Sequence, residues 1–103
     1  MNDSTAHTAS SQDCASRLRV LADETRLQVL QQLFEVPKRV AELNETLDLP
    51  HNLLSHHLRV LREAGLVLSE RDGRSVVYRL APGVQVKRKA KRLDLGCCRL
   101  SFE

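Results

Sequence analysis

The segment HNLLSHHLRVLREAGLVLSERDGRSVVYRL, residues 51 to 80, decides the fold of this chain. Its first half carries leucines at spacings of four and three, which predicts an amphipathic helix over residues 52 to 64 with Asn52 as its N-cap. These leucines are Leu54, Leu58 and Leu61. Its second half alternates apolar and polar residues on both sides of Asp72-Gly73, a pair typical of β-hairpin turns. The segment therefore predicts a helix followed directly by a hairpin.

Three more helices are expected upstream. The first begins near Asp13 and places four apolar residues on one face. These residues are Cys14, Leu18, Leu21 and Ala22. Asp23 is the expected N-cap of a second helix over residues 24 to 34, and a third helix is expected over residues 38 to 47. Because a tight turn separates the third helix from the fourth, the pair predicts a helix-turn-helix.

The segments outside these elements complete the predicted organisation. Residues 1 to 12 are polar and predict a flexible arm, and residues 13 to 83 form the DNA-binding domain. Residues 84 to 103 form a C-terminal segment that is expected to begin with a helix over residues 84 to 95. The predicted fold is mainly α with a β-hairpin wing: a winged helix-turn-helix of order α-α-α-α-β-β-α. A core of Leu and Val is marginal in so short a chain, which favours a homodimer.

Composition narrows the function. The chain has 103 residues and a formal net charge of +3, and five of its sixteen Lys and Arg residues fall between Lys87 and Arg92. No apolar run is long enough for a membrane helix, and the polar start lacks the apolar stretch of a signal peptide, so a cytoplasmic protein without membrane contact is expected. Neither a phosphate-cradling glycine loop nor a nucleophile elbow occurs, which argues against an enzyme.

Three segments together resemble the ArsR/SmtB family of bacterial winged-helix repressors. They are LADETRLQVL at 21 to 30, SHHLRVLREAGLV at 55 to 67 and RDGRSVVYRL at 71 to 80. The resemblance implies a homodimer that packs its first and last helices across a two-fold axis, binds double-stranded operator DNA and leaves it when an inducer binds. It thereby makes residues 84 to 103 the expected dimerisation and sensor segment.

Two metal sites of that family lack their ligands in this chain. The founding metalloid site uses cysteines on the third helix, but the corresponding segment here reads ELNETLDL, at residues 42 to 49. A second family site uses His residues of the last helix, and residues 84 to 103 contain no His. An inducer must therefore be bound elsewhere.

The fourth helix and the wing carry the candidate DNA contacts. Side chains on the outward face of the helix suit base edges, because Asn pairs with adenine while Ser and His donate hydrogen bonds. Arginines on the helix and at the wing suit phosphates. Asn52, Leu53, Ser55 and His56 are assigned to base edges, Arg59 and Arg62 to the backbone, and Arg71 and Arg74 to the wing contact. For His57, helix packing and base readout both remain open.

Three cysteines form the candidate sensor. Cys97 and Cys98 are adjacent, and Cys14 begins a helix that the resemblance places near the last helix. Three is a small and odd number for a disulfide scaffold, so thiols are expected. Thiolates bind thiophilic species, and arsenite or antimonite is the expected inducer, with cadmium and lead as alternatives. Two other interpretations stay open: a redox or persulfide sensor that forms a disulfide between Cys14 and Cys97 or Cys98, and cysteines that merely fill apolar space. The basic run at 87 to 92 fits a solvated face as well as a DNA contact.

Overall fold

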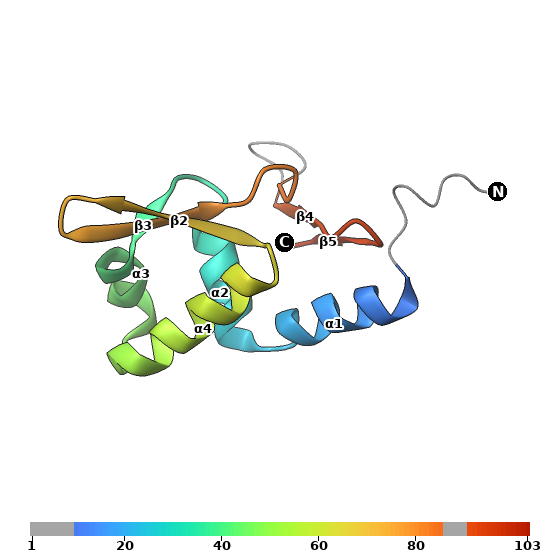
Figure 1. Ribbon diagram of the computed structural model, residues 1–103, viewed down its shortest axis with the longest axis horizontal. Coiled ribbons are helices and arrows are strands. Elements are labelled where there is room, and N and C mark those ends of the chain that lie inside the picture. The colour runs from blue at the N-terminus through green and yellow to red at the C-terminus, as the bar shows by residue number, and fades with distance from the viewer. Residues whose placement is uncertain (1–9, 86–90) are drawn as a thin grey trace.

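The structure, a computed structural model, describes residues 10–85 and 91–103. Within these ranges the chain forms a bundle of helices with a β-hairpin at one end and a second, shorter hairpin at the other (Figure 1). The helices are α1 (Ser11–Leu21), α2 (Glu24–Gln32), α3 (Val40–Leu47) and α4 (His51–Glu63), and the strands are β1 (Lys38–Arg39), β2 (Val67–Asp72), β3 (Ser75–Leu80), β4 (Arg92–Asp94) and β5 (Arg99–Ser101).

The predicted winged helix is confirmed. Strands β2 and β3 pair antiparallel, with Asp72 opposite Ser75, and Gly73 takes a positive φ of 64° in the turn between them. The short strand β1 adds to the other edge of β3, which gives a sheet of order β1-β3-β2. This sheet packs beside α4 and α3, so the hairpin is the wing of a helix-turn-helix.

The core is built mainly from leucine, as the composition predicts. Leu54, Leu58 and Leu61 are at most 1% exposed and turn one face of α4 towards α2 and β2. The rest of the buried cluster comes from the end of α1, from α2 and α3, and from the two hairpins with their flanking residues, and consists of Leu21, Val29, Leu30, Leu33, Phe34, Leu43, Leu66, Val67, Tyr78, Val84, Leu93 and Leu95. Because this burial favours one rotation of α4, it also decides which side chains of α4 face solvent.

A side-chain brace shapes the turn between α3 and α4. Asn44 donates from Nδ2 to the Leu49 carbonyl at 2.9 Å and accepts at Oδ1 from the Leu49 amide at 2.8 Å. Asp48 ends α3 in the left-handed region with a φ of 51°, which Asp adopts more readily than most residues. The turn is thus held by the side chain of Asn44 as well as by the backbone.

Some predicted helix boundaries are wrong. The third helix begins at Val40 and not at Lys38, because Lys38 and Arg39 pair with β3. The fourth helix begins at His51 with Pro50 as its N-cap, so Asn52 is not the cap. Asp23 is confirmed as the N-cap of α2, and its carboxylate accepts from the Arg26 amide at 3.1 Å.

The helix expected over residues 84 to 95 is wrong wherever the structure describes that segment. Residues 92 to 94 form β4, which pairs with β5, and Gln85 bridges to Leu93. Leu93 and Leu95 are both buried, and their spacing of two is that of a strand. Gly96, with a φ of 88°, then reverses the chain. Residues 86 to 90, which hold most of the basic run, lie outside the described residues.

The first helix starts earlier than predicted. Ser10 caps it by accepting from the Asp13 amide at 3.1 Å, so the helix takes in two residues that the expected arm at 1 to 12 had included. The rest of that arm, residues 1 to 9, lies outside the described residues. In the described ranges, no helix has both the length and the apolar character needed to cross a bilayer.

Neighbouring leucines of α4 offer a test of this packing. Leu54→Ala should destabilise the fold by about 2–5 kcal/mol, because it leaves a cavity in a closely packed core. Leu53→Ala should cost less than about 1 kcal/mol, because Leu53 is 41% exposed. Urea unfolding followed by circular dichroism measures both, and equal losses would contradict the assigned rotation of α4.

Candidate nucleic-acid interface and cysteine cluster

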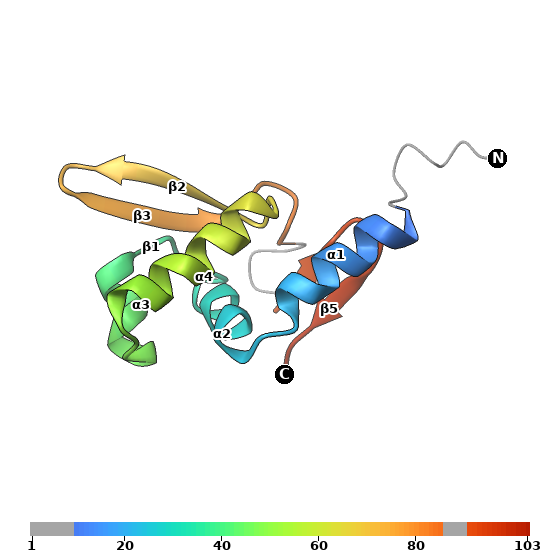
Figure 2. The ribbon, with the colours of Figure 1, turned by 60° about the horizontal axis from the view of Figure 1, so that its bottom comes forward.

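The candidate residues gather at two opposite ends of the molecule. The N-terminal end of α4 and the turn of the β2–β3 wing lie at one end (Figure 1). Helix α1 and the β4–β5 hairpin lie side by side at the other end, as both ribbon views show (Figure 2). DNA contact and cysteine chemistry are therefore assigned to separate parts of the fold.

The outward face of α4 presents the side chains predicted for DNA contact. Asn52, His56 and Arg59 are exposed, and Ser55 is half-buried. Arg62 follows one turn after Arg59 and is also exposed, and Leu53 adds an apolar exposed surface. The face thus offers amide, imidazole and hydroxyl groups near the start of α4 and guanidinium groups further along.

The wing carries three arginines and two acids, and their pairing determines its charge. Glu70 accepts from Arg79 at 2.8 Å, and Asp72 accepts from Arg39 at 3.0 Å. Neither Arg71 nor Arg74 forms an ion pair within the described part of the chain. The two acids of the wing are therefore occupied by other arginines, and the two predicted wing contacts keep their full charge.

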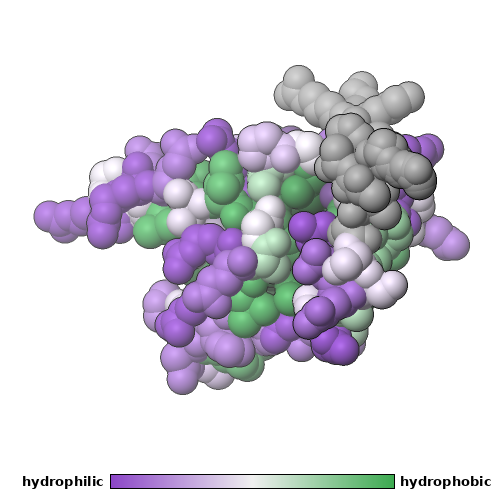
Figure 3. Space-filling view, turned by 45° about the vertical axis from the view of Figure 1, so that its right-hand side comes forward, coloured by the Kyte–Doolittle hydropathy of each residue, from purple (hydrophilic) through white to green (hydrophobic). Residues whose placement is uncertain are grey.

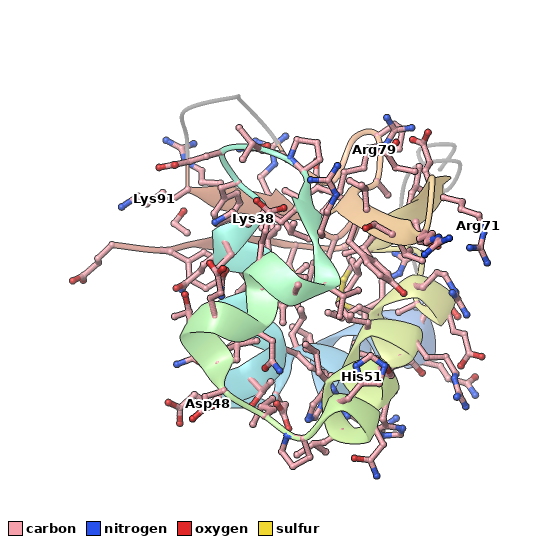
Figure 4. All side chains as sticks on the ribbon, turned by 90° about the vertical axis from the view of Figure 1, so that its left-hand side faces the viewer. Lys38, Asp48, His51, Arg71, Arg79 and Lys91 are labelled. Carbon is pink, nitrogen blue, oxygen red and sulfur yellow. A yellow bond between two sulfur atoms is a disulfide. The ribbon has the colours of Figure 1, made fainter. Side chains whose placement is uncertain are left out.

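Figure 4 views the molecule from the wing end. Arg71 projects outwards on the same side of the view as α4, where His51 marks the start of that helix, whereas Arg79 lies over the sheet. Sequence reasoning did not assign a role to Arg39 or Arg79. Their pairing with the wing acids depends on the alignment of β1 with β3, which the sequence pattern did not reveal.

The structure places His57 inside and not on the outward face. It is 8% exposed, and its Nδ1 accepts a hydrogen bond from Nε of Arg26 at 3.1 Å. Burial lowers the pKa of His57 below its usual 6.5; the carboxylate of Asp23 opposes this shift, and the positive charges of Arg26 and His56 add to it. Of the two open readings, packing is the one that this position supports.

The cysteine cluster joins the start of α1 to the turn between β4 and β5. The turn forms because Leu95 donates its amide to the Cys98 carbonyl at 2.9 Å, which leaves Gly96 and Cys97 at the tip. There Cys97 meets Cys14 of α1, with 5.8 Å between their Cα atoms, and the two form a disulfide. The expectation of three free thiols is thus wrong for this pair, because the fold brings their backbones to disulfide distance.

Cys98 completes the cluster as a free cysteine. Its Sγ lies 3.8 Å from Sγ of Cys97, and all three sulfur atoms lie within 4.8 Å of one another. All three residues are half-buried. The predicted grouping of Cys14, Cys97 and Cys98 therefore has a compact geometry within one chain, in which three sulfur atoms could reach one thiophilic atom once the disulfide is reduced.

Arg17 supports the same junction. Arg17 lies one helical turn after Cys14, and its Nη1 donates to the Leu95 carbonyl at 2.6 Å. A side chain at Gly96 would approach that guanidinium to 3.1 Å, so the turn and α1 fit closely. Lys91 and Arg92 of the basic run, a few residues before Leu95 in the sequence, are exposed. The other basic residues of the run, Lys87, Arg88 and Lys89, lie outside the described residues.

Comparison with known proteins identifies related chains. The family model described as "Bacterial regulatory protein, arsR family" matches residues 23–69. The transcriptional regulator NmtR of Mycobacterium tuberculosis is 47% identical over 66 residues, which are 64% of this chain and 55% of that protein. The arsenical resistance operon repressor of Escherichia coli is 42% identical over 67 residues, which are 64% of this chain and 57% of that repressor.

Solved structures show the same fold. Reduced HlyU from Vibrio cholerae superposes with a TM-score of 0.66 and 37% identity, over 69% of this chain and 75% of that one. A possible transcriptional regulator for arsenical resistance gives a TM-score of 0.62 and 40% identity, over 65% of this chain and 70% of that one. The chain spans about half the length of the first curated relatives it matches.

The buried His57 predicts a pH dependence of stability. Its pKa is lower in the folded chain than in the unfolded chain, so the unfolded state binds more protons below about pH 6.5. Stability should be fully present above that pH and should fall as the pH drops below it. Urea unfolding between pH 7.5 and pH 5 measures this effect. The free energy of unfolding should fall less for His57→Asn than for wild type, because asparagine does not titrate. Parallel profiles for the two proteins would contradict the assignment.

Proposed function

Because the chain belongs to the ArsR/SmtB family of bacterial regulatory proteins, we propose that it is a cytoplasmic transcriptional repressor that releases its operator when arsenite binds its cysteines. The observation that carries the sensing part is the grouping of Cys14, Cys97 and Cys98 within 4.8 Å. The family consists of regulators and not of enzymes, and the exposed face of α4 supports the DNA-binding part.

The proposed repressor reads double-stranded DNA with α4 and holds the backbone with the wing. Base edges in the major groove meet Asn52, Leu53, Ser55 and His56. Arg59 and Arg62 approach phosphates beside the groove, while Arg71 and Arg74 reach the backbone or the minor groove from the wing. The absence of acid partners for these arginines in the described chain supports this arrangement, because they keep their charge for phosphate.

A second copy of the chain completes the proposed DNA-binding unit. Leu18 of α1 is 40% exposed although it belongs to the apolar face predicted for that helix. Figure 3 shows a further gathering of hydrophobic residues between hydrophilic ones on one face of the molecule. A homodimer that covers α1 would bury such surface and place two copies of α4 in successive major grooves, about 34–36 Å apart.

Arsenite suits the cluster once the Cys14–Cys97 disulfide is reduced. A dithiol reductant supplies two electrons and two protons, is itself oxidised to a disulfide, and leaves Cys14, Cys97 and Cys98 as three thiols. Arsenite, As(OH)3, then exchanges its three hydroxyl groups for three thiolates and releases three water molecules, which leaves a pyramidal AsS3 centre. Sulfur is the ligand preferred by such soft centres, and antimonite, cadmium or lead are the related inducers to compare. Binding draws the turn that carries Cys97 and Cys98 against α1.

One experiment on the wing tests the proposed DNA contact. Arg74→Ala should weaken binding to all duplex sequences and lower the slope of log affinity against log salt by about one, because one phosphate contact is lost. Arg99→Ala is the matched control, since Arg99 is an exposed arginine of β5 at the opposite end of the molecule. His56→Ala should instead change sequence preference. Fluorescence anisotropy at several salt concentrations measures these effects, and equal slopes for Arg74→Ala and Arg99→Ala would contradict the wing contact.

A second experiment tests the inducer. Arsenite added to DNA-bound protein, reduced beforehand with a phosphine that offers no competing thiol, should weaken DNA binding by about 5- to 150-fold. Cys98→Ser should abolish this response because only two thiolates remain, and X-ray absorption should report three sulfur ligands in wild type. If the same arsenite concentration also released the Cys98→Ser variant from DNA, the three-thiolate site would be contradicted.

The disulfide favours one alternative, a redox-sensing repressor. In that case a peroxide takes two electrons and two protons from the thiols of Cys14 and Cys97 and is reduced to water and an alcohol or to two waters, and the disulfide that forms alters the DNA-bound state. Cys98→Ser separates the two functions, because it leaves the Cys14–Cys97 pair intact. If the protein is a redox sensor, Cys98→Ser should still release DNA on oxidation, whereas Cys14→Ser should not. Wild type should then show no response to arsenite.

A further inference from the structure

One guanidinium group connects three helices. Arg26, in the first turn of α2, donates from Nε to Nδ1 of His57 in α4 at 3.1 Å. Its Nη1 donates to the carbonyl of Val20, in the last turn of α1, at 3.1 Å. Its own backbone amide is held by the carboxylate of Asp23, which caps α2. The Arg26 side chain is therefore fixed at the point where α1, α2 and α4 meet.

His57 occupies a special place on α4. It follows His56, which is exposed, and precedes Leu58, which is 1% exposed. Accepting from Arg26 at Nδ1 requires the neutral ring with its proton on Nε2, and the cationic donor makes the hydrogen bond charge-assisted. His57 is thus a directional polar contact between the buried side of α4 and the rest of the domain.

The leucines of α4 and this hydrogen bond restrain the helix differently. Apolar burial determines which face of α4 points inwards, but because it is non-directional it restrains a small rotation of α4 less sharply than a hydrogen bond does. A hydrogen bond weakens when its distance or angle departs from a narrow range. A rotation of about 10° moves a side-chain tip that lies about 5–6 Å from the helix axis by about 1 Å. That displacement is larger than the range of a good hydrogen bond to a base.

We propose that Arg26 and His57 are positioning residues that set the rotation of α4 and thereby the sequence selectivity of DNA binding. This inference rests on the proposed DNA-binding function. Neither side chain needs to touch DNA. The pair should affect base readout by Ser55 and His56 more than phosphate contact, because flexible arginines tolerate a shift of about 1 Å whereas base hydrogen bonds do not.

The test compares three variants with a matched control. His57→Leu removes the Nδ1 acceptor and substitutes an apolar side chain of similar size. His57→Asn instead supplies an amide oxygen near the position of Nδ1. Arg26→Lys keeps the positive charge, but one ammonium group cannot follow the fork geometry that reaches both Val20 and His57. Arg19→Lys makes the same chemical change at an exposed position of α1.

The probes are a duplex enriched by wild type from a random-sequence pool and an unrelated duplex of equal length. The readout is the ratio of the two affinities. His57→Leu and Arg26→Lys should lower this ratio by about 10-fold or more, the size expected when one base contact is lost. Affinity for the unrelated duplex and its salt dependence should stay as in wild type. His57→Asn and Arg19→Lys should keep the wild-type ratio.

Thermal unfolding by circular dichroism shows which variants fold. If His57→Leu does not fold, Arg26→Lys decides the question, because it retains the charge and the Asp23 cap. A folded His57→Leu or Arg26→Lys with the wild-type ratio would overturn the inference and leave the proposed function standing. Failure of wild type to enrich any duplex would overturn the proposed function, and the inference with it.

Discussion

The burial of one leucine stripe on α4 is the constraint on which the rest of the structure depends. Leu54, Leu58 and Leu61 are withdrawn from water against α2 and β2, and each buried side chain of this kind contributes about 1.5–3 kcal/mol. With that face inside, the helical period leaves the polar side chains of α4 outside. The stripe also places His57 beside Arg26, so the hydrophobic contact and the polar contact define the same orientation of the helix.

The opposite end of the molecule is held by different forces. Helix α1 makes few core contacts of its own, since Leu21 is its buried residue. A covalent bond from Cys14 to Cys97 and a hydrogen bond from Arg17 to the Leu95 carbonyl instead attach it to the C-terminal turn. An attachment through sulfur depends on redox state and on thiophilic ligands, whereas an apolar core does not. Chemistry at the cysteines can therefore alter the seating of α1 and leave the winged helix folded.

The sequence predicted those parts of the structure that local patterns determine. The leucine spacing of α4, the Asp72-Gly73 turn and the Asp23 cap each act within a few residues, and the structure confirms them. The helix expected at the C-terminal end is wrong in the described residues, because Leu93 and Leu95 are buried at the spacing of a strand and β4 pairs with β5. The sequence predicts which three cysteines group together. Their disulfide pairing depends on how α1 meets the β4–β5 hairpin, which no local pattern encodes.

Long-range pairing also explains how a chain of modest net charge presents a positive surface at the wing. Residues 51 to 80 contain five arginines and three acids, a balance of +2 that alone gives little electrostatic attraction. In the folded chain Glu70 is paired with Arg79 on the neighbouring strand, and Asp72 is paired with Arg39, which lies outside this segment. Exposed pairs of this kind add little stability. Their consequence is electrostatic: they neutralise the acids of the wing locally, so that Arg71 and Arg74 present charge that the overall composition conceals.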